Sequence, residues 1–257
     1  MGPEQLDEIF AQTLTGDYDD ESPWEAVRTL HSTGGREVCD RAAEWCPSDD
    51  PLKWARGADV LGQLGRTVEH PSNNFPEECF TLVSTLVQRE EDPLPLLSAI
   101  HALGHIGNPL AVPLVIDHRL HPSADVRFAV ACALGSFAND SRAADALLAL
   151  MQDADEDVRD WATFGLGVLG DLDSQEIRDA LWQRMSDPHT DVREESLVGL
   201  GKRKDQRALP AHIAEFNQPE ISSRMVEAAE AFLGEKEQAA DRSPGDYLAA
   251  LKRRFPL

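Results

Sequence analysis

Histidines at helical spacing are the residues of this 257-residue chain with the clearest potential for chemistry. His101 and His105 are four residues apart, and His118 and His121 are three apart, so each pair would share one face of a helix. Two imidazoles one turn apart can bind a transition metal. However, no acidic residue lies between the first pair, and no cysteine stands at ligand spacing. We therefore expect two partly buried and two surface histidines, with no metal site and no cofactor.

Motifs for nucleotide binding and nucleophilic catalysis do not occur in the sequence. It contains neither G-x-x-x-x-G-K-[ST] nor G-x-S-x-G. The segment from Gly165 to Gly170 has the spacing G-x-G-x-x-G, but it follows a helical pattern rather than a strand. We therefore interpret it as a helix-packing motif, and we expect no enzymatic activity.

The charge balance restricts the class of partner. The chain has 24 Lys and Arg against 46 Asp and Glu, which gives a formal net charge of −22. Such a field repels phosphate backbones and favours basic partners, although solubility alone would also account for it. Nucleic acid is thus an unfavourable partner, and a basic protein is a favourable one.

Further features favour a cytoplasmic protein that does not contact a membrane. No apolar run approaches the ~18 residues that span a bilayer. The N-terminus lacks the basic flank and apolar core of a signal peptide. Because the cysteines form no C-x-x-C pair, we expect them to be small buried hydrophobes in a reducing compartment: Cys39, Cys46, Cys79 and Cys132.

A recurring sequence motif, called the phrase below, indicates the helices that position these side chains. Asp-Val-Arg occurs three times, with a Leu-Gly pair beginning seven residues after each arginine; Arg127, Arg159 and Arg193 are 32 and 34 residues apart. Such a period is typical of helix pairs stacked into a solenoid. The Asp caps the start of a helix, and the Gly either permits close helix packing or ends the helix. We call the helix that starts with this phrase helix A and the following one helix B.

Weaker copies extend the array in both directions. Trp54 and Leu96 occupy the arginine position in the N-terminal half, and Arg224 occupies it near the C-terminus. The long interval between Trp54 and Leu96 predicts an insertion loop at residues 66–76. We predict an all-α fold, a right-handed α-solenoid of about seven HEAT-like helix pairs. It would form one domain over residues 1–257, with capping units at residues 1–50 and 220–257.

Acidic residues at a fixed distance before the arginines predict a structural ladder. Asp153 precedes Arg159 by six residues, and Asp187 precedes Arg193 by six. An Asp at the end of one helix B and an Arg at the start of a helix A can pair along the stack. Such pairs fix the stagger between repeats more than they add stability. Arg127 would begin the ladder, which is therefore expected only in the C-terminal half.

Two surfaces are candidates for binding a partner. Trp161 follows the buried face of its helix, whereas Trp182 would lie on the flank of a helix B, where an exposed tryptophan can anchor a partner. B helices line the concave groove of such stacks, so other side chains would share that surface: Arg178, Asp179, Glu176, His212 and Glu215. The second candidate is a basic cluster in a turn: Lys202, Arg203, Lys204 and Arg207. A tryptophan tucked between repeats and a solvated turn are the structural alternatives.

The pattern of Asp-Val-Arg followed by Leu-Gly resembles the short HEAT repeats of phycobilisome lyases, over residues 90–235. Three stretches, Asp157 to Phe164, Ile177 to Asp179 and Val198 to Arg207, look like the enterobacterial YibA-type family. That resemblance implies a binder, because proteins of this type are thought to be immunity partners that neutralise contact-dependent Rhs toxins. The leading hypothesis is therefore a non-catalytic scaffold that binds another protein, with a basic toxin domain as its sharpest version.

The repeat type also implies alternative functions. A bilin lyase-like protein would bind a tetrapyrrole, and a HEAT-like DNA glycosylase would bind duplex DNA in a basic groove, which the net charge disfavours. HEAT-repeat di-iron hydroxylases carry His-Glu dipeptides in several repeats. This chain contains no His-Glu dipeptide, so that enzyme class is rejected.

Overall fold

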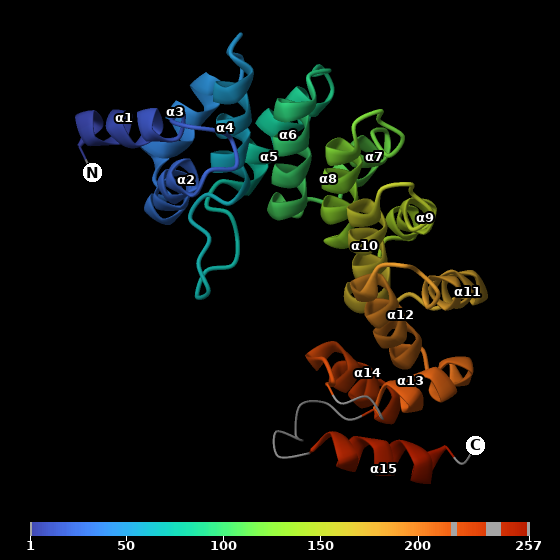
Figure 1. Cartoon of the computed structure of the whole chain (residues 1–257). Helices are drawn as coiled ribbons and strands as arrows, with labels where there is room; N and C mark the ends of the chain where they lie inside the picture. Colours follow the sequence, from blue (N-terminus) through green and yellow to red (C-terminus); the bar gives the residue numbers. More distant parts are fainter. Residues whose placement is uncertain (1, 217–219, 235–242, 256–257) are drawn as a thin grey trace. The chain divides into compact units, whose positions relative to one another are not determined.

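The structure is a computed structural model that describes residues 2–216, 220–234 and 243–255. Within these residues all regular secondary structure is helical, as the sequence predicted, and the helices form an α-solenoid (Figure 1). By its internal contacts the chain divides into two compact units, unit 1 (Met1–Phe137) and unit 2 (Ala138–Leu257), and the single domain over residues 1–257 stays a prediction. None of the described helices is long and apolar enough to cross a membrane.

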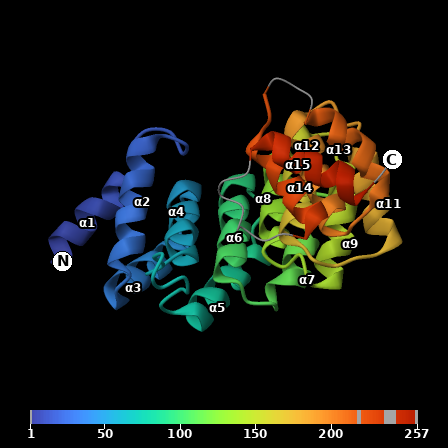
Figure 2. The same ribbon diagram turned by 90° about the horizontal axis from the view of Figure 1, so that it is seen from below.

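Unit 1 is built on three successive A helices. The helix α4 packs on α6, and α6 packs on α8, while α3, α5 and α7 lie against this row (Figures 1 and 2). The arginine position of the repeat lies in each A helix, as Trp54 in α4, Leu96 in α6 and Arg127 in α8. The helices are α1 (Pro3–Gln12), α2 (Glu21–Thr33), α3 (Arg36–Trp45), α4 (Pro51–Gly62), α5 (Pro76–Val87), α6 (Pro93–Ile106), α7 (Ala111–Ile116) and α8 (Ala124–Gly135).

Unit 2 repeats this plan with one irregular helix. Its A helices are α10, α12 and α14, and α12 packs on both α10 and α14. The Gly-rich segment continues α10 as a π-helix, which is consistent with a packing role. The elements are α9 (Ser141–Leu150), α10 (Glu156–Phe164), the π-helix (Gly165–Leu169), α11 (Gln175–Arg184), α12 (Thr190–Lys202), a 3₁₀ turn (Gln206–Ala208), α13 (Leu209–Glu215), α14 (Ser223–Leu233) and α15 (Pro244–Arg254).

The glycine of the Leu-Gly phrase permits close packing between consecutive A helices. A Cβ added at Gly62 would lie 2.9 Å from the Cα of Ala102, and one at Gly104 would lie 2.7 Å from the Cα of Ala133. Both distances are too short for a side chain to be accommodated without moving the partner helix. Of the two roles considered for this glycine, packing is therefore the one found here, and it brings the A helices of unit 1 side by side.

The connection between α4 and α5 contains the predicted insertion and is anchored by two asparagines. The Asn73 side chain donates to the backbone oxygen of Leu61 at 2.7 Å, and the Asn74 side chain donates to that of Gly34 at 2.8 Å. Gly65 has a φ of +75°, and a Cβ there would collide with Asn74. The connection is thereby fixed against α2 and α4. The capping units at residues 1–50 and 220–257 stay predictions; residues 235–242 and 256–257 lie outside the described part.

The arginines of the predicted ladder make two kinds of contact. Nη1 of Arg159 donates to the backbone oxygen of Asp153 at 2.9 Å, and Nη1 of Arg193 donates to that of Asp187 at 2.8 Å. In unit 1, Arg127 donates in the same way to the backbone of the turn before its helix. Arg159 also pairs with the Asp187 side chain, 3.0 Å from Nε to Oδ2. Each arginine thus closes its own turn, and Arg159 reaches the aspartate of the following repeat.

Candidate functional site

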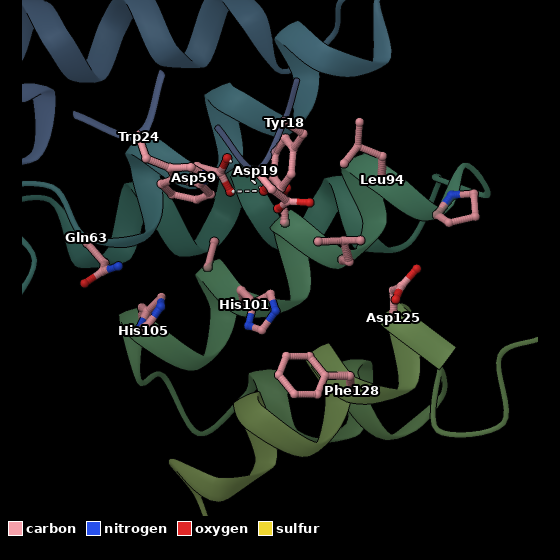
Figure 3. A pocket seen from close by; sticks show the side chains of 14 residues that line it. Tyr18, Asp19, Trp24, Asp59, Gln63, Leu94, His101, His105, Asp125 and Phe128 are labelled. Carbon is pink, nitrogen blue, oxygen red and sulfur yellow. Dashed lines mark hydrogen bonds between the residues drawn. The ribbon is translucent and has the colours of Figure 1, made fainter. Parts of the chain in front are cut away.

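A cavity of about 670 Å³ opens on the side of unit 1 formed by α2, α4, α6 and α8 (Figure 3). We call this side the A-helix face. Two aromatic side chains come from the N-terminal part, Tyr18 from the α1–α2 connection and Trp24 from α2, and Phe128 comes from α8. The remaining lining residues are Asp19, Asp59, Gln63, Pro93, Leu94, Leu97, Ser98, Ala102, His101, His105 and Asp125.

The inner wall of the cavity is a closed network of polar groups. The Tyr18 hydroxyl donates to the Asp59 carboxylate at 3.1 Å and lies 2.8 Å from Oγ of Ser98. Burial is the main cause that raises the pKa of Asp59 to about 6, and the neighbouring Arg56 guanidinium opposes that shift. Nε2 of His31 lies 2.9 Å from the backbone oxygen of Asp59, which places a neutral imidazole behind the same residue. The network holds Tyr18 in one position.

Arg56 positions both aromatic walls from behind. Its side chain is fully buried, with hydrogen bonds to the backbone oxygens of Thr13 at 3.0 Å and Tyr18 at 2.7 Å. The guanidinium carbon lies 4.3 Å from the Tyr18 ring centroid and 4.8 Å from that of Trp24. An ion pair with Asp59 at 3.3 Å compensates its charge. A buried arginine with these partners fixes the α1–α2 connection over α4.

The histidines differ from one another in their surroundings. Burial lowers the pKa of His101 to about 4, so its imidazole is neutral at pH 7, and its ring meets Phe128 edge-on at 6.1 Å. His105 is exposed at the edge of the cavity. The expectation that His118 and His121 lie on the surface is wrong, because both are half-buried. Nδ1 of His121 accepts a hydrogen bond from the backbone of its own turn at 3.1 Å, which holds the ring against it.

The composition of the cavity favours a cation. Three aspartates line it, Asp19, Asp59 and Asp125, and no Lys or Arg is among the described residues that do so. Aromatic faces attract ammonium and guanidinium groups, and nearby carboxylates add a Coulombic attraction. The neutral imidazole of His101 does not oppose such a charge. The cavity can therefore receive a basic side chain whose apolar stem packs on Leu94 and Leu97.

Trp182 is partly exposed at the surface of unit 2, and a cation from the same unit lies on its ring. Trp182 is 39% exposed on α11, and the Arg207 guanidinium lies 5.6 Å from its ring centroid. Arg207 also pairs with Asp179 at 2.7 Å, and Arg178 pairs with Asp173 at 2.6 Å. Glu176 and Glu215 are exposed. A partner would have to displace Arg207 to reach the face of the tryptophan that it covers.

Two expectations about side-chain exposure are wrong. His212 is fully buried rather than on a binding surface, because its ring packs against Phe216 at 5.2 Å and Phe232 at 5.5 Å. Trp161 is 39% exposed rather than in the core, and its ring meets Phe164 edge-on at 5.5 Å. In both cases the spacing within one helix did not show what the neighbouring helices supply.

The basic cluster is largely engaged with the backbone of unit 2. Nζ of Lys202 donates to the backbone oxygen of Val168 at 2.6 Å, and the buried Arg203 donates to that of Leu166 at 2.9 Å. Lys204 donates to the backbone oxygens at the end of α14. These side chains close helix C-termini, as cations commonly do. Arg203 is thus buried where an exposed contact residue was expected.

Sequence reasoning missed the cavity because its aromatic residues lie outside the repeat. Tyr18 and Trp24 belong to the N-terminal segment before the first clear copy of the phrase. One signal was available in the sequence. Leu97 and Phe128 each stand directly after the arginine position of their repeat, and both are apolar. Their shared register placed them on one face, but only the fold brings Tyr18 and Trp24 over it.

Comparisons with known proteins agree with this architecture. Residues 81–167 match the model of the HEAT repeats family. The fold and the repeat therefore define an α-solenoid, part of which is similar to HEAT repeats. Over 229 residues the chain is 27% identical to Protein YibA of Escherichia coli strain K12, an alignment that covers 87% of this chain and 79% of that protein.

Solved structures show the same fold. The X-ray structure of E. coli YibA has a TM-score of 0.71 at 23% identity and covers 97% of this chain and 95% of its own. The complex of CpcE and CpcF of phycocyanin lyase from Nostoc sp. PCC7120 has a TM-score of 0.51 at 14% identity, with 97% and 94% covered. A designed armadillo repeat protein in complex with the peptide (KR)4 has a TM-score of 0.50 at 15% identity, with 76% and 98% covered.

Proposed function

We propose that this chain is a non-catalytic repeat scaffold that binds a basic segment of a partner protein, with a Lys or Arg side chain entering the cavity of unit 1. The observation that carries this proposal is the combination of three aromatic side chains and three aspartates in one cavity without a basic lining residue. The net charge of −22 draws basic partners towards this surface from a distance.

The interior of the cavity is already organised for this role. Tyr18 and Trp24 are held by Arg56, so little side-chain freedom is lost when a ligand binds. Asp125 is exposed near the cavity mouth and can pair with a charge as it arrives. Asp59 lies at the inner wall with a raised pKa, and a cation beside it would lower that pKa again.

One comparison supports the partner class. A designed armadillo repeat protein of similar fold is bound to a peptide of alternating Lys and Arg, so a helical solenoid can accommodate such a chain. The finer proposal, that the partner is a toxin domain and that the chain is an immunity protein, rests on the resemblance of the sequence to the YibA-type family. A basic toxin would satisfy both the cavity and the charge. The surface of Trp182, Asp179 and Arg207 is the competing place for it.

The test is fluorescence anisotropy with a labelled octapeptide of alternating Lys and Arg, titrated with the full chain. Asp125→Asn should weaken binding about tenfold, because it removes a carboxylate at the cavity. The matched control is Asp157→Asn, which makes the same charge change at the same repeat position in unit 2, where the aspartate is also exposed. Its affinity should stay within about twofold of the wild type.

A charge-neutral variant separates the cavity from the general acidic field. Trp24→Ala leaves the net charge unchanged and removes an aromatic wall, so it should also weaken binding about tenfold. Circular dichroism of each variant verifies that the helices remain folded. Equal loss in Asp125→Asn and Asp157→Asn, with none in Trp24→Ala, would mean that the peptide only follows net charge. That result would remove the cavity from the proposal.

A further inference from the structure

A second cluster with ligand chemistry belongs to unit 2, whereas the proposed peptide site belongs to unit 1. Asp160 is on α10, His189 directly precedes α12, and Asp191 is in the first turn of α12. Each offers one ligand atom, and these atoms lie within 4.8 Å of one another. An imidazole with two carboxylates is a ligand set that divalent transition metals accept.

Buried polar atoms without partners occur at this cluster. Oδ1 of Asp160 and Nδ1 of His189 are 3.8 Å apart and inaccessible to solvent, and neither makes a hydrogen bond to any described residue. A buried polar group without a partner costs about 1–3 kcal/mol. Such groups in a folded protein therefore indicate a partner of another kind, such as an ion or an ordered water.

Glu195 adds an independent observation one turn further along α12. Its side chain is 7% exposed, and its Oε2 atom is buried without a hydrogen bond in the described structure. Burial, followed by the charge of Asp160, raises the pKa of Glu195 to about 9. The cluster thus gathers the carboxyl groups of Asp160, Asp191 and Glu195 near one imidazole, and two of these side chains have a buried oxygen without a hydrogen bond in the described structure.

The arginine that the chain itself supplies offsets the negative charge of the cluster only in part. Nη2 of Arg224 on α14 lies 3.8 Å from Oε1 of Glu195, an ion pair beyond hydrogen-bonding distance. Its Nη1 pairs with Glu227 at 2.7 Å, and the guanidinium lies 5.3 Å from the Phe164 ring centroid. Among the described residues, the Asp160 and His189 atoms pair with each other at 3.8 Å and with no Lys or Arg.

We propose that Asp160, His189 and Asp191 bind one divalent transition-metal ion of the Zn²⁺ class, with Glu195 as the acidic group behind them. Ligand atoms at ~2.1 Å from a zinc ion are at most ~4.2 Å apart. The separation of 3.8 Å between Asp160 and His189 meets this limit, and small side-chain rotations bring the third atom within it. The ion joins α10 to α12 and so links two consecutive repeats of unit 2.

The test is calorimetric titration of the EDTA-treated full chain with ZnCl₂. The expected result is saturable binding of one ion per chain. His189→Ala and Asp160→Asn should each weaken binding by tenfold or more. His70→Ala is the matched control, since it removes an exposed histidine from the α4–α5 connection of unit 1, and its affinity should equal that of the wild type.

A second measurement keeps the proposal falsifiable if a variant is unstable. Co²⁺ added to the wild-type chain should produce visible absorption bands that His189→Ala removes and His70→Ala retains. Absence of stoichiometric Zn²⁺ binding to the wild-type chain would overturn the proposal and leave Asp160 and His189 as an ion pair alone. Unchanged binding in a folded His189→Ala variant would also overturn it. Neither outcome bears on peptide binding in unit 1.

Discussion

The A helices of the two units carry polar side chains at matching repeat positions, but the surroundings of these side chains differ. In unit 1, Ser98 lies two residues after the arginine position, and its hydroxyl contacts Tyr18 at 2.8 Å. In unit 2, Glu195 occupies that position, and one of its carboxylate oxygens has no partner among the described residues. The polar side chain at one repeat position therefore either completes a hydrogen-bond network or leaves it incomplete, according to which hydrogen-bond partners the neighbouring helices supply.

The two units also differ in how a buried charge is compensated. Arg56 in unit 1 is compensated by Asp59 and by two backbone oxygens, so the aromatic walls are set before any ligand arrives. Asp160 in unit 2 pairs with His189 at 3.8 Å, without a hydrogen bond to Oδ1 among the described residues. We have therefore proposed a cation site in the open cavity of unit 1 and another between the helices of unit 2.

The largest effect should follow from removing the buried arginine of unit 1. Arg56→Met should lower the free energy of unfolding of unit 1 by about 3–5 kcal/mol, because it leaves Asp59 as an uncompensated buried charge. Hydrogen exchange in α2 and α4 measures this loss separately from unit 2. Adding Asp59→Asn should restore part of it. Arg28→Met on α2, which removes an exposed partner of Glu21, is the control, and an equal loss there would contradict the account.

Unit 2 should lose stability as the pH rises, through Glu195. Its pKa is raised from 4.5 to about 9, so the folded unit keeps a proton that the unfolded chain releases. The free energy of unfolding therefore falls between these values, by about 4 kcal/mol from pH 5 to pH 8 at 1.36 kcal/mol per unit. Hydrogen exchange of α12 in EDTA, corrected for the intrinsic pH dependence of exchange, measures this decline. Glu195→Gln should abolish it.

Over the same pH range the free energy of unfolding of unit 1 should change differently from that of unit 2. The pKa of Asp59 is raised to about 6, so the free energy of unfolding of unit 1 falls as the pH rises towards that value. This loss is complete once Asp59 is ionised. The pKa of His101 is lowered to about 4, so the stabilising contribution of its neutral imidazole is lost as the pH falls below about 6.5, where the unfolded histidine gains a proton; protonation of Asp59 below about pH 6 opposes that loss. Between pH 7 and pH 8 unit 1 should be nearly flat. A parallel decline in both units would show that Glu195 does not cause it.

Zinc should stabilise unit 2 and leave unit 1 unchanged. At a free concentration 100 times the Kd, a ligand that binds only the folded state adds about 2.7 kcal/mol. Slowed hydrogen exchange in α10 and α12 but not in α4 or α6 is the expected pattern. His189→Ala should remove the effect. Equal stabilisation of both units would indicate weak binding to scattered surface carboxylates.

The smallest effect is expected at the competing surface of unit 2. Trp182→Ala should change the affinity for the Lys and Arg peptide by less than about twofold, because Trp182 belongs to unit 2 and does not line the cavity of unit 1. Fluorescence anisotropy under the conditions used for Trp24→Ala makes the two tryptophans directly comparable. A tenfold loss in Trp182→Ala with none in Trp24→Ala would reverse the comparison and move the partner to the B helices.

Repeat spacing was enough to predict the all-α solenoid, because the helical period recurs with each copy of the phrase. The expectation that the Asp of the phrase caps its helix is wrong: Asp125, Asp157 and Asp191 lie in the first turn, and the N-caps are Ser123, Asp155 and His189. The exposure of single side chains was harder to predict from the sequence. The exposure of Trp161 and the burial of His212 depend on side chains from adjacent helices, which the periodicity of one helix does not contain. The exposed position of Trp182 agrees with the sequence, but Arg207 on its ring was not foreseen.

Both candidate sites depend on contacts between segments distant in sequence. Asp160 and His189 are 29 residues apart, one on α10 and one before α12, so a search for ligands within one helix overlooks them. Tyr18 reaches the unit 1 cavity from a connection outside the repeat, and Arg56 holds it there. Sequence pattern predicts the register of a solenoid, whereas such sites arise from packing across repeats.

The central claim, that a basic segment binds the A-helix face of unit 1, is tested most directly by hydrogen exchange of the full chain with and without the Lys and Arg octapeptide. The account predicts slowed exchange in the α1–α2 connection and along α2, α6 and α8, with no change in α11 or in residues 206–208. Protection confined to α11 and residues 206–208 would contradict it and assign binding to the surface of Trp182.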